Sequence, residues 1–239
     1  MHVVDRVGSS LRIALGAVIL IASAATDVAR AATKDEARWF LQFAGGASSM
    51  QLDDVKSYYE GVLDSYRASG IPIETQREFP ANLIVGGDLL YALPRDFRIG
   101  IGTRYTWSHA YALYGDFAGT LDVVGEVQLL AFQIVVEKAW STSGSWSPFV
   151  ELRAGSGRVS INVSQTIVLT QYAQGGAEVS LDGDGRAPLA ELHVGIRHPM
   201  GRSFLLGTAG YRHCTVPGPP FELQVSGFVA TLGLGLVIH

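Results

Sequence analysis

The feature that most constrains this chain is a period-two alternation of apolar side chains with small or polar ones. The last alternating segment, FVATLGLGLVIH, carries no acid, Lys or Arg between Phe228 and His239. Successive side chains of a β-strand point to opposite faces, so the pattern predicts strands with two chemically different faces. Eight such strands are expected, near Arg38–Ser48, Asn82–Leu93, Phe97–Tyr111, Leu121–Val136, Trp146–Val163, Leu189–His198, Phe204–Cys214 and Leu223–Ile238.

The apolar residues are spread over these segments and do not form one block. The mean hydropathy is +0.23 and 17% of the residues are charged, yet no long stretch beyond residue 30 is apolar enough to be a transmembrane helix. A soluble β-sandwich also alternates, so alternation alone leaves two fold classes open.

Two further patterns favour a closed sheet in a membrane. The expected polar faces mix Arg with carboxylates and almost lack Lys, which suits a narrow interior because Arg binds a carboxylate through two hydrogen bonds. Aromatic residues gather near the expected strand ends, as they do where hydrocarbon meets water. These aromatic residues are Trp39, Phe43, Tyr91, Tyr105, Trp107, Trp146, Phe204 and Tyr211.

The connections between the expected strands alternate in length. The odd-numbered ones are longer on average, with a long stretch at Ser164–Pro188, whereas the even-numbered Pro199–Ser203 is tight. Outer-membrane barrels have long external loops and short periplasmic turns, and both chain ends lie in the periplasm. In such a barrel the apolar last strand closes the sheet against the first, because an unpaired strand edge is costly in hydrocarbon.

The N-terminal segment predicts export. Arg6 and Arg12 precede an apolar run from Ile13 to Ala25, and Ala29-Arg30-Ala31 resembles a cleavage site. This order is typical of a secretory signal peptide over residues 1–31, which leaves a barrel domain over 32–239. An uncleaved anchor helix is the alternative, although the run is short for a bilayer core.

The signal segment, the alternating strands and the apolar last strand together resemble the small eight-stranded outer-membrane β-barrels of Gram-negative bacteria, the OmpA/OmpX type. The resemblance implies an all-β transmembrane antiparallel up-and-down barrel of eight strands in the cell outer membrane. It also implies contact with outer-membrane lipid and lipopolysaccharide, and with the barrel-assembly machinery during insertion. Such barrels usually end on an aromatic residue, whereas this chain ends on Ile238-His239.

Two irregular regions interrupt the strand pattern. Apolar residues at helical spacing predict an amphipathic helix over Gln51–Ser69. We favour a loop helix without a role; the alternative is a surface helix that covers the external mouth or lies on lipid. Thr166–Tyr172 and Ala177–Leu181 read as a hairpin that extends two strands or, alternatively, raises the strand number to ten. Asp182-Gly-Asp184-Gly before Pro188 is interpreted as a polar external loop in preference to a calcium loop, because further ligands are absent.

The inward polar residues are the candidate site. We expect them to form a network of ion pairs that fills the lumen of a narrow barrel, where eight strands leave room only for side chains. The members of this expected network are Asp88, Arg98, Arg104, Glu126, Glu151, Arg153, Glu191, His193, Arg197 and Arg212.

Candidate catalytic and metal groups are weaker. Glu191 with His193, and Ser108 with His109, are the nearest approaches to a hydrolase or acyltransferase site, but two residues along one strand span roughly 7 Å. His213 and Cys214 are adjacent and point to opposite faces, so a shared metal ion is not expected. No cofactor is predicted.

These observations predict an integral outer-membrane barrel with a structural or surface-interaction role and no enzymatic activity. A lipid-modifying hydrolase or acyltransferase is the alternative, and a narrow pore is a third reading. The mildly acidic balance of charges argues against a nucleic-acid partner, and the sequence identifies no external ligand.

Overall fold

The computed structural model describes residues 38–79, 82–116, 119–140, 145–169, 176–216 and 223–238. The expected signal peptide over residues 1–31 and the last loop at Pro217–Phe221 lie outside these ranges. Within them, no helix is both long and apolar enough to cross a membrane.

Eight antiparallel strands form a closed barrel, as the alternation predicts. Each strand pairs with its neighbours along the chain, and the last strand pairs with the first, Trp39 opposite Ile238 and Ser48 opposite Val229. The barrel strands are β1 (Trp39–Ser48), β3 (Asn82–Leu93), β4 (Phe97–Gly115), β5 (Gly119–Ala139), β6 (Ser147–Leu169), β7 (Gly176–Met200), β8 (Ser203–Val216) and β10 (Gly227–Ile238). Two short strands lie outside the ring: β2 (Glu74–Arg77) pairs with β4, and β9 (Leu223–Gln224) pairs with β8.

The structure explains the alternation of large and small residues in the last strand, β10. The large residues Phe228 and Leu232 point outward, with exposed fractions of 73% and 76%. Gly235 points inward, where a Cβ atom would lie 2.0 Å from the ring of Phe204. The glycine therefore leaves room for an aromatic side chain of the lumen. Phe204 is 2% exposed, so its expected place among the outward aromatic residues is wrong.

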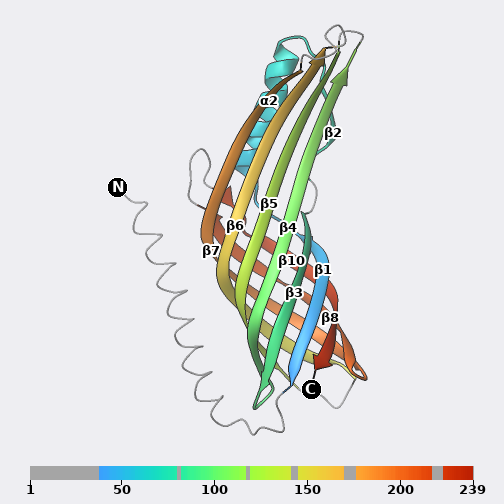
Figure 1. Ribbon diagram of the computed structural model, residues 1–239, viewed down its shortest axis with the longest axis vertical. Coiled ribbons are helices and arrows are strands. Elements are labelled where there is room, and N and C mark those ends of the chain that lie inside the picture. The colour runs from blue at the N-terminus through green and yellow to red at the C-terminus, as the bar shows by residue number, and fades with distance from the viewer. Residues whose placement is uncertain are drawn as a thin grey trace, which may run out of the picture.

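Strands β4–β7 continue far beyond the closed barrel, and we call this part the extension (Figure 1). The hairpin expected near residues 166–181 lengthens β6 and β7, and the barrel keeps eight strands. The prediction of a polar loop from Asp182 to Pro188 is wrong, because these residues lie within β7 and pair with β6 from Ser156 to Asn162. The long connection of the sequence is thus mostly strand.

The expected amphipathic helix is present as α2 (Asp53–Ala68). Asp53 and Asp54 in its first turn suit the positive end of the helix dipole. Its end is fixed by Gly70 at φ 84°, while the N–H of Ile71 donates to the carbonyl of Tyr66.

Helix α2 lies beside the far end of the extension (Figure 1) and supplies one side of a separate apolar core. Val55, Tyr59 and Leu63 are buried against the inner face of the extension. The core residues from the strands include Ala110, Ala112, Val123, Val127, Leu129, Val159, Ile161, Val163, Ala187 and Leu189. The helix therefore covers this end of the barrel, which the sequence analysis considered but did not favour.

Gly125 on β5 allows α2 to approach the sheet. A Cβ atom at Gly125 would lie 2.8 Å from the ring of Phe79 and 3.1 Å from that of Tyr59. We expect Gly125→Val to weaken the docking of α2 by about 1–3 kcal/mol, because the added methyl groups overlap both rings. Hydrogen exchange of the α2 amides measures this loss. Gly115→Val is the control, since the only contact of its Cβ, Thr120 at 3.6 Å, is ordinary.

The phenol of Tyr59 makes this docking sensitive to alkaline pH. Burial, with a smaller effect of the Glu60 carboxylate, raises the pKa of Tyr59 from 10.0 to about 12. The folded state favours the neutral phenol, so its contribution is complete below pH 10 and is lost as the pH rises towards 12. The tyrosinate absorbance of the wild type minus that of Tyr59→Phe should therefore titrate near pH 12. A difference that titrates near pH 10 would show that the phenol is not desolvated.

Candidate functional site

Charged side chains from five strands meet in the middle of the lumen. The even residues of β3, β4 and β8 and the odd residues of β6 and β7 point inward, as their burial shows. These positions alternate with apolar outward residues such as Ile101, Leu192 and Val194. The same alternation that makes the outside apolar therefore brings the charges together inside.

The first group of ion pairs is centred on Arg153. Its guanidinium binds the Asp88 carboxylate through two hydrogen bonds, Nη1–Oδ1 at 2.6 Å and Nη2–Oδ2 at 2.7 Å, and its Nε donates to Glu151 at 2.5 Å. Gln42 Nε2 from β1 donates to the second Asp88 oxygen at 2.8 Å. A planar guanidinium thus holds two carboxylates in a confined space.

The second group is centred on Glu191. Its two carboxylate oxygens accept hydrogen bonds from Arg104 Nη1 at 2.8 Å and Arg212 Nε at 2.6 Å. His193 Nε2 lies 2.9 Å from the same oxygen that Arg104 contacts. Arg104 also lies 3.8 Å from Glu151, so it connects this group with the first.

A third group lies nearer the end of the barrel where the chain terminates. Arg197 binds both oxygens of Glu137, at 2.9 and 2.7 Å, and Arg98 binds one of them at 2.5 Å. The guanidinium of Arg197 lies 4.8 Å from the ring centre of Phe149 and 4.7 Å from that of Phe204. Aromatic faces and a carboxylate therefore replace water around this cation.

The structure brings nine of the ten expected residues into these groups and leaves one outside. Glu126 lies on the outer face of β5, where it accepts a hydrogen bond from Gln128, and its assignment to the lumen is wrong. Its position is in the extension, where the inner face packs α2 and the outer face meets water. The polar and apolar sides of β5 are therefore exchanged relative to the barrel below.

Glu137 is the lumen residue that the sequence analysis missed. It is fully buried and shares its inward face with Val127, Leu129 and Val135. Its partners Arg98 and Arg197 were both expected in the lumen. Because buried guanidinium groups need a carboxylate partner, these two residues could have indicated a further inward acid. Four carboxylates thus face five guanidinium groups among the described lumen residues.

The candidate catalytic pairs have different arrangements. Glu191 and His193 do meet, contrary to the expectation from strand spacing, because both side chains lean towards each other. The same carboxylate is already occupied by Arg104 and Arg212. Ser108 is buried in the lumen, whereas His109 points to the opposite face, so this pair does not converge.

The residues considered for metal binding lie on β7 and β8. Asp184 pairs with Arg158 at 2.7 Å and Asp182 accepts a hydrogen bond from Asn162. His213 and Cys214 lie on opposite faces of β8. Across the described ranges, no three His, Cys, Asp or Glu side chains are grouped as a metal site requires.

Glu137→Gln tests how strongly the lumen depends on its ion pairs. Removing this charge leaves Arg98 and Arg197 buried without a carboxylate, so we expect the free energy of unfolding to fall by about 3 kcal/mol. Urea unfolding in lipid vesicles, followed by tryptophan fluorescence, measures the change. Asp64→Asn breaks an exposed pair with Arg67 on α2 and should cost less than about 1 kcal/mol. Equal losses in the two variants would contradict the desolvated state of the lumen pairs.

No family model matches this chain, and no curated protein sequence is similar to it. Several solved structures are similar in architecture. Neisserial surface protein A is 11% identical, with 84% of this chain and 97% of that chain covered and a TM-score of 0.46. The outer membrane protein OprG from Pseudomonas aeruginosa is 12% identical, with 84% and 96% covered and a TM-score of 0.41. Ail from Yersinia pestis, in complex with a heparin analogue, is 11% identical, with 85% and 99% covered and a TM-score of 0.39. The assignment of this chain as a closed eight-stranded barrel rests on its own strand pairing.

Proposed function

We propose that this chain is an integral outer-membrane barrel with a structural or surface-interaction role and a lumen that does not conduct. The observation that carries the proposal is the pairing of an apolar outer face with a charged, filled interior. Water would make this arrangement unfavourable, whereas hydrocarbon outside a narrow polar lumen makes it stable.

The outer face supports the membrane part of this proposal. Large apolar side chains are exposed on strands all around the ring, and the exposed fractions of Ile101 and Phe132 are 65% and 63%. An exposed apolar surface of this extent is typical of contact with lipid or with another protein. Closure of the ring by β1 and β10 leaves no unpaired strand edge in the apolar belt, which is what a bilayer requires.

The interior supports a role without transport. Ion pairs occupy the middle of the lumen, and α2 with its apolar core covers the end that carries the extension. Eight strands enclose a space that side chains fill. The extension then stands outside the membrane on the side away from the chain end, where it offers a rigid surface to other molecules.

Two measurements test this proposal. The purified chain should require detergent or lipid to remain folded and monomeric, and a folded monomer in plain buffer would contradict the membrane assignment. In a planar lipid bilayer the wild type should show no stepwise current. Regular conductance steps from the wild type would contradict a closed lumen.

A combined variant should open the barrel. Arg104→Ser with Arg153→Ser shortens two central side chains, and Gly125→Val weakens the docking of α2 at the far end, so together they reduce both obstructions. We expect stepwise current from this triple variant. The same two serine substitutions combined with Gly115→Val, which leaves α2 docked, should remain closed.

A further inference from the structure

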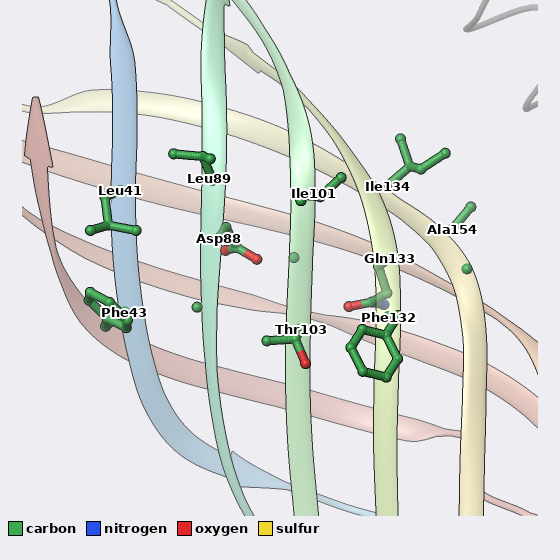
Figure 2. Close-up of a pocket in the computed structure, with 13 residues that line it drawn as sticks. Leu41, Phe43, Asp88, Leu89, Ile101, Thr103, Phe132, Gln133, Ile134 and Ala154 are labelled. Carbon is green, nitrogen blue, oxygen red and sulfur yellow. The ribbon is translucent and has the colours of Figure 1, made fainter. Parts of the chain in front are cut away.

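The outer face of the barrel has a groove of about 640 Å³ that crosses β1, β3, β4, β5 and β6. Figure 2 shows Phe43 and Leu89 on one side of it and Phe132 and Ile134 on the other. Gly87 faces outward and has no side chain, so the wall of β3 is low here, and Asp88 and Gln133 also line the groove. It lies in the middle of the apolar belt, where its contents would be hydrocarbon.

From this groove a row of small outward side chains, which we call the track, continues along β6 towards the extension. The outward residues there are small, Ala154 and then Ser156, and they are followed by Arg158. On the neighbouring strand β7, Ala190 and Pro188 lead in the same direction to Arg186. The outer side chains of β5 beside the track are large, Leu130 and Phe132. Small outward side chains therefore lie between the groove and the two arginines.

The two arginines form a cationic row at the upper limit of the apolar belt. Arg158 and Arg186 are direct partners in the β6–β7 pairing, and both are exposed on the outer face. Like charges directly opposite each other are unfavourable unless an anion compensates them. Asp184 binds Arg158 through both of its carboxylate oxygens, and its charge also acts on Arg186, which has no carboxylate within ion-pair distance among the described residues. One positive charge is thus left for an anion from outside.

We propose that this face binds lipopolysaccharide, with an acyl chain in the groove and a lipid A phosphate at Arg158 and Arg186. This inference rests on the proposed function, which puts the extension outside the cell and the two arginines at the outer leaflet. Acyl chains match the apolar lining, and guanidinium groups bind phosphate through paired hydrogen bonds. About four residues separate Ala154 from Arg158, roughly 13 Å of strand, which one acyl chain spans easily.

Native mass spectrometry of the full chain, released from detergent micelles that contain lipid A, measures the retained lipid. We expect Arg158→Gln with Arg186→Gln to lower the retention at least about tenfold, as the loss of one or two charge-assisted contacts predicts. Ala154→Phe, which fills the groove, should lower it similarly. Ser156→Phe blocks the track from an exposed position, so it keeps this arm informative if Ala154→Phe folds poorly.

Matched controls change the same residue types elsewhere on the barrel. Arg95→Gln with Arg202→Gln removes two exposed arginines from the turns at the opposite end. Ala209→Phe adds a ring to the exposed outer face of β8. Both controls should retain lipid A as the wild type does. Dephosphorylated lipid A, which lacks the phosphate, should be retained at least about tenfold less by the wild type. Phosphatidylglycerol has one phosphodiester with a single negative charge and only two acyl chains, so it should also be retained less than lipid A.

The outcomes separate this inference from the proposed function. Unchanged retention in the arginine and groove variants would overturn it and leave only general lipid contact. A loss of lipid A retention in only the arginine variant, or in only the groove variants, would show that the groove and the arginines do not hold the same molecule. Equal retention of phosphatidylglycerol would overturn lipopolysaccharide as the occupant. A chain that inserts normally yet gives any of these results would still satisfy the proposed function.

Discussion

Pairing of the last strand with the first is the constraint on which the rest of the structure depends. Trp39 to Ser48 meet Val229 to Ile238 in an unbroken antiparallel register. Closure satisfies the backbone of both strands without water. It also sets an inside and an outside for every other strand, so the inward positions of Arg104 and Arg153 and the outward positions of Leu192 and Leu232 follow from it. The apolar residues of β10 are the part of the sequence that reflects this closure.

The two faces of the sheet have opposite polarity in the barrel and in the extension. In the barrel the strands are apolar outside and charged inside, while in the extension the inner face is apolar against α2 and the outer face carries Glu126, Arg158 and Asp184. The change of polarity occurs within single strands, without a break in pairing. Residues of β5 show this most clearly, since Val127 and Glu137 share one face but have opposite chemistry.

This change explains how much of the molecule could be predicted from its sequence. The alternation of β4, from Phe97 to Ser108, was enough to predict both the strand and its inward arginines. Glu126 was misplaced because the polar residues of β5 change faces at the level of the belt. Asp182-Gly-Asp184-Gly was taken for a loop because these residues favour turns, yet the long pairing with β6 keeps them extended. The residue pattern of a single strand does not show at which residue the polarity of its two faces is exchanged.

The ion pairs of the lumen and the packing of α2 stabilise different parts of the molecule. Arg153 and Glu191 organise a desolvated centre in which every charge has a nearby opposite charge, and such an arrangement favours one register over its alternatives. The core of α2 holds the extension by shape and apolar contact. Loss of one set is not expected to remove the other.

In the orientation proposed above, the one-sided covering of the extension determines which surface faces the outside of the cell. Helix α2 occupies the inner face of β4–β7, so the outer face of these strands is bare. A large molecule such as an antibody or a phage tail fibre would meet these strands before it reached the lipid surface. The sequence most exposed to such encounters is therefore ordered β-sheet, where a change of one side chain alters a fixed epitope and leaves the barrel beneath untouched.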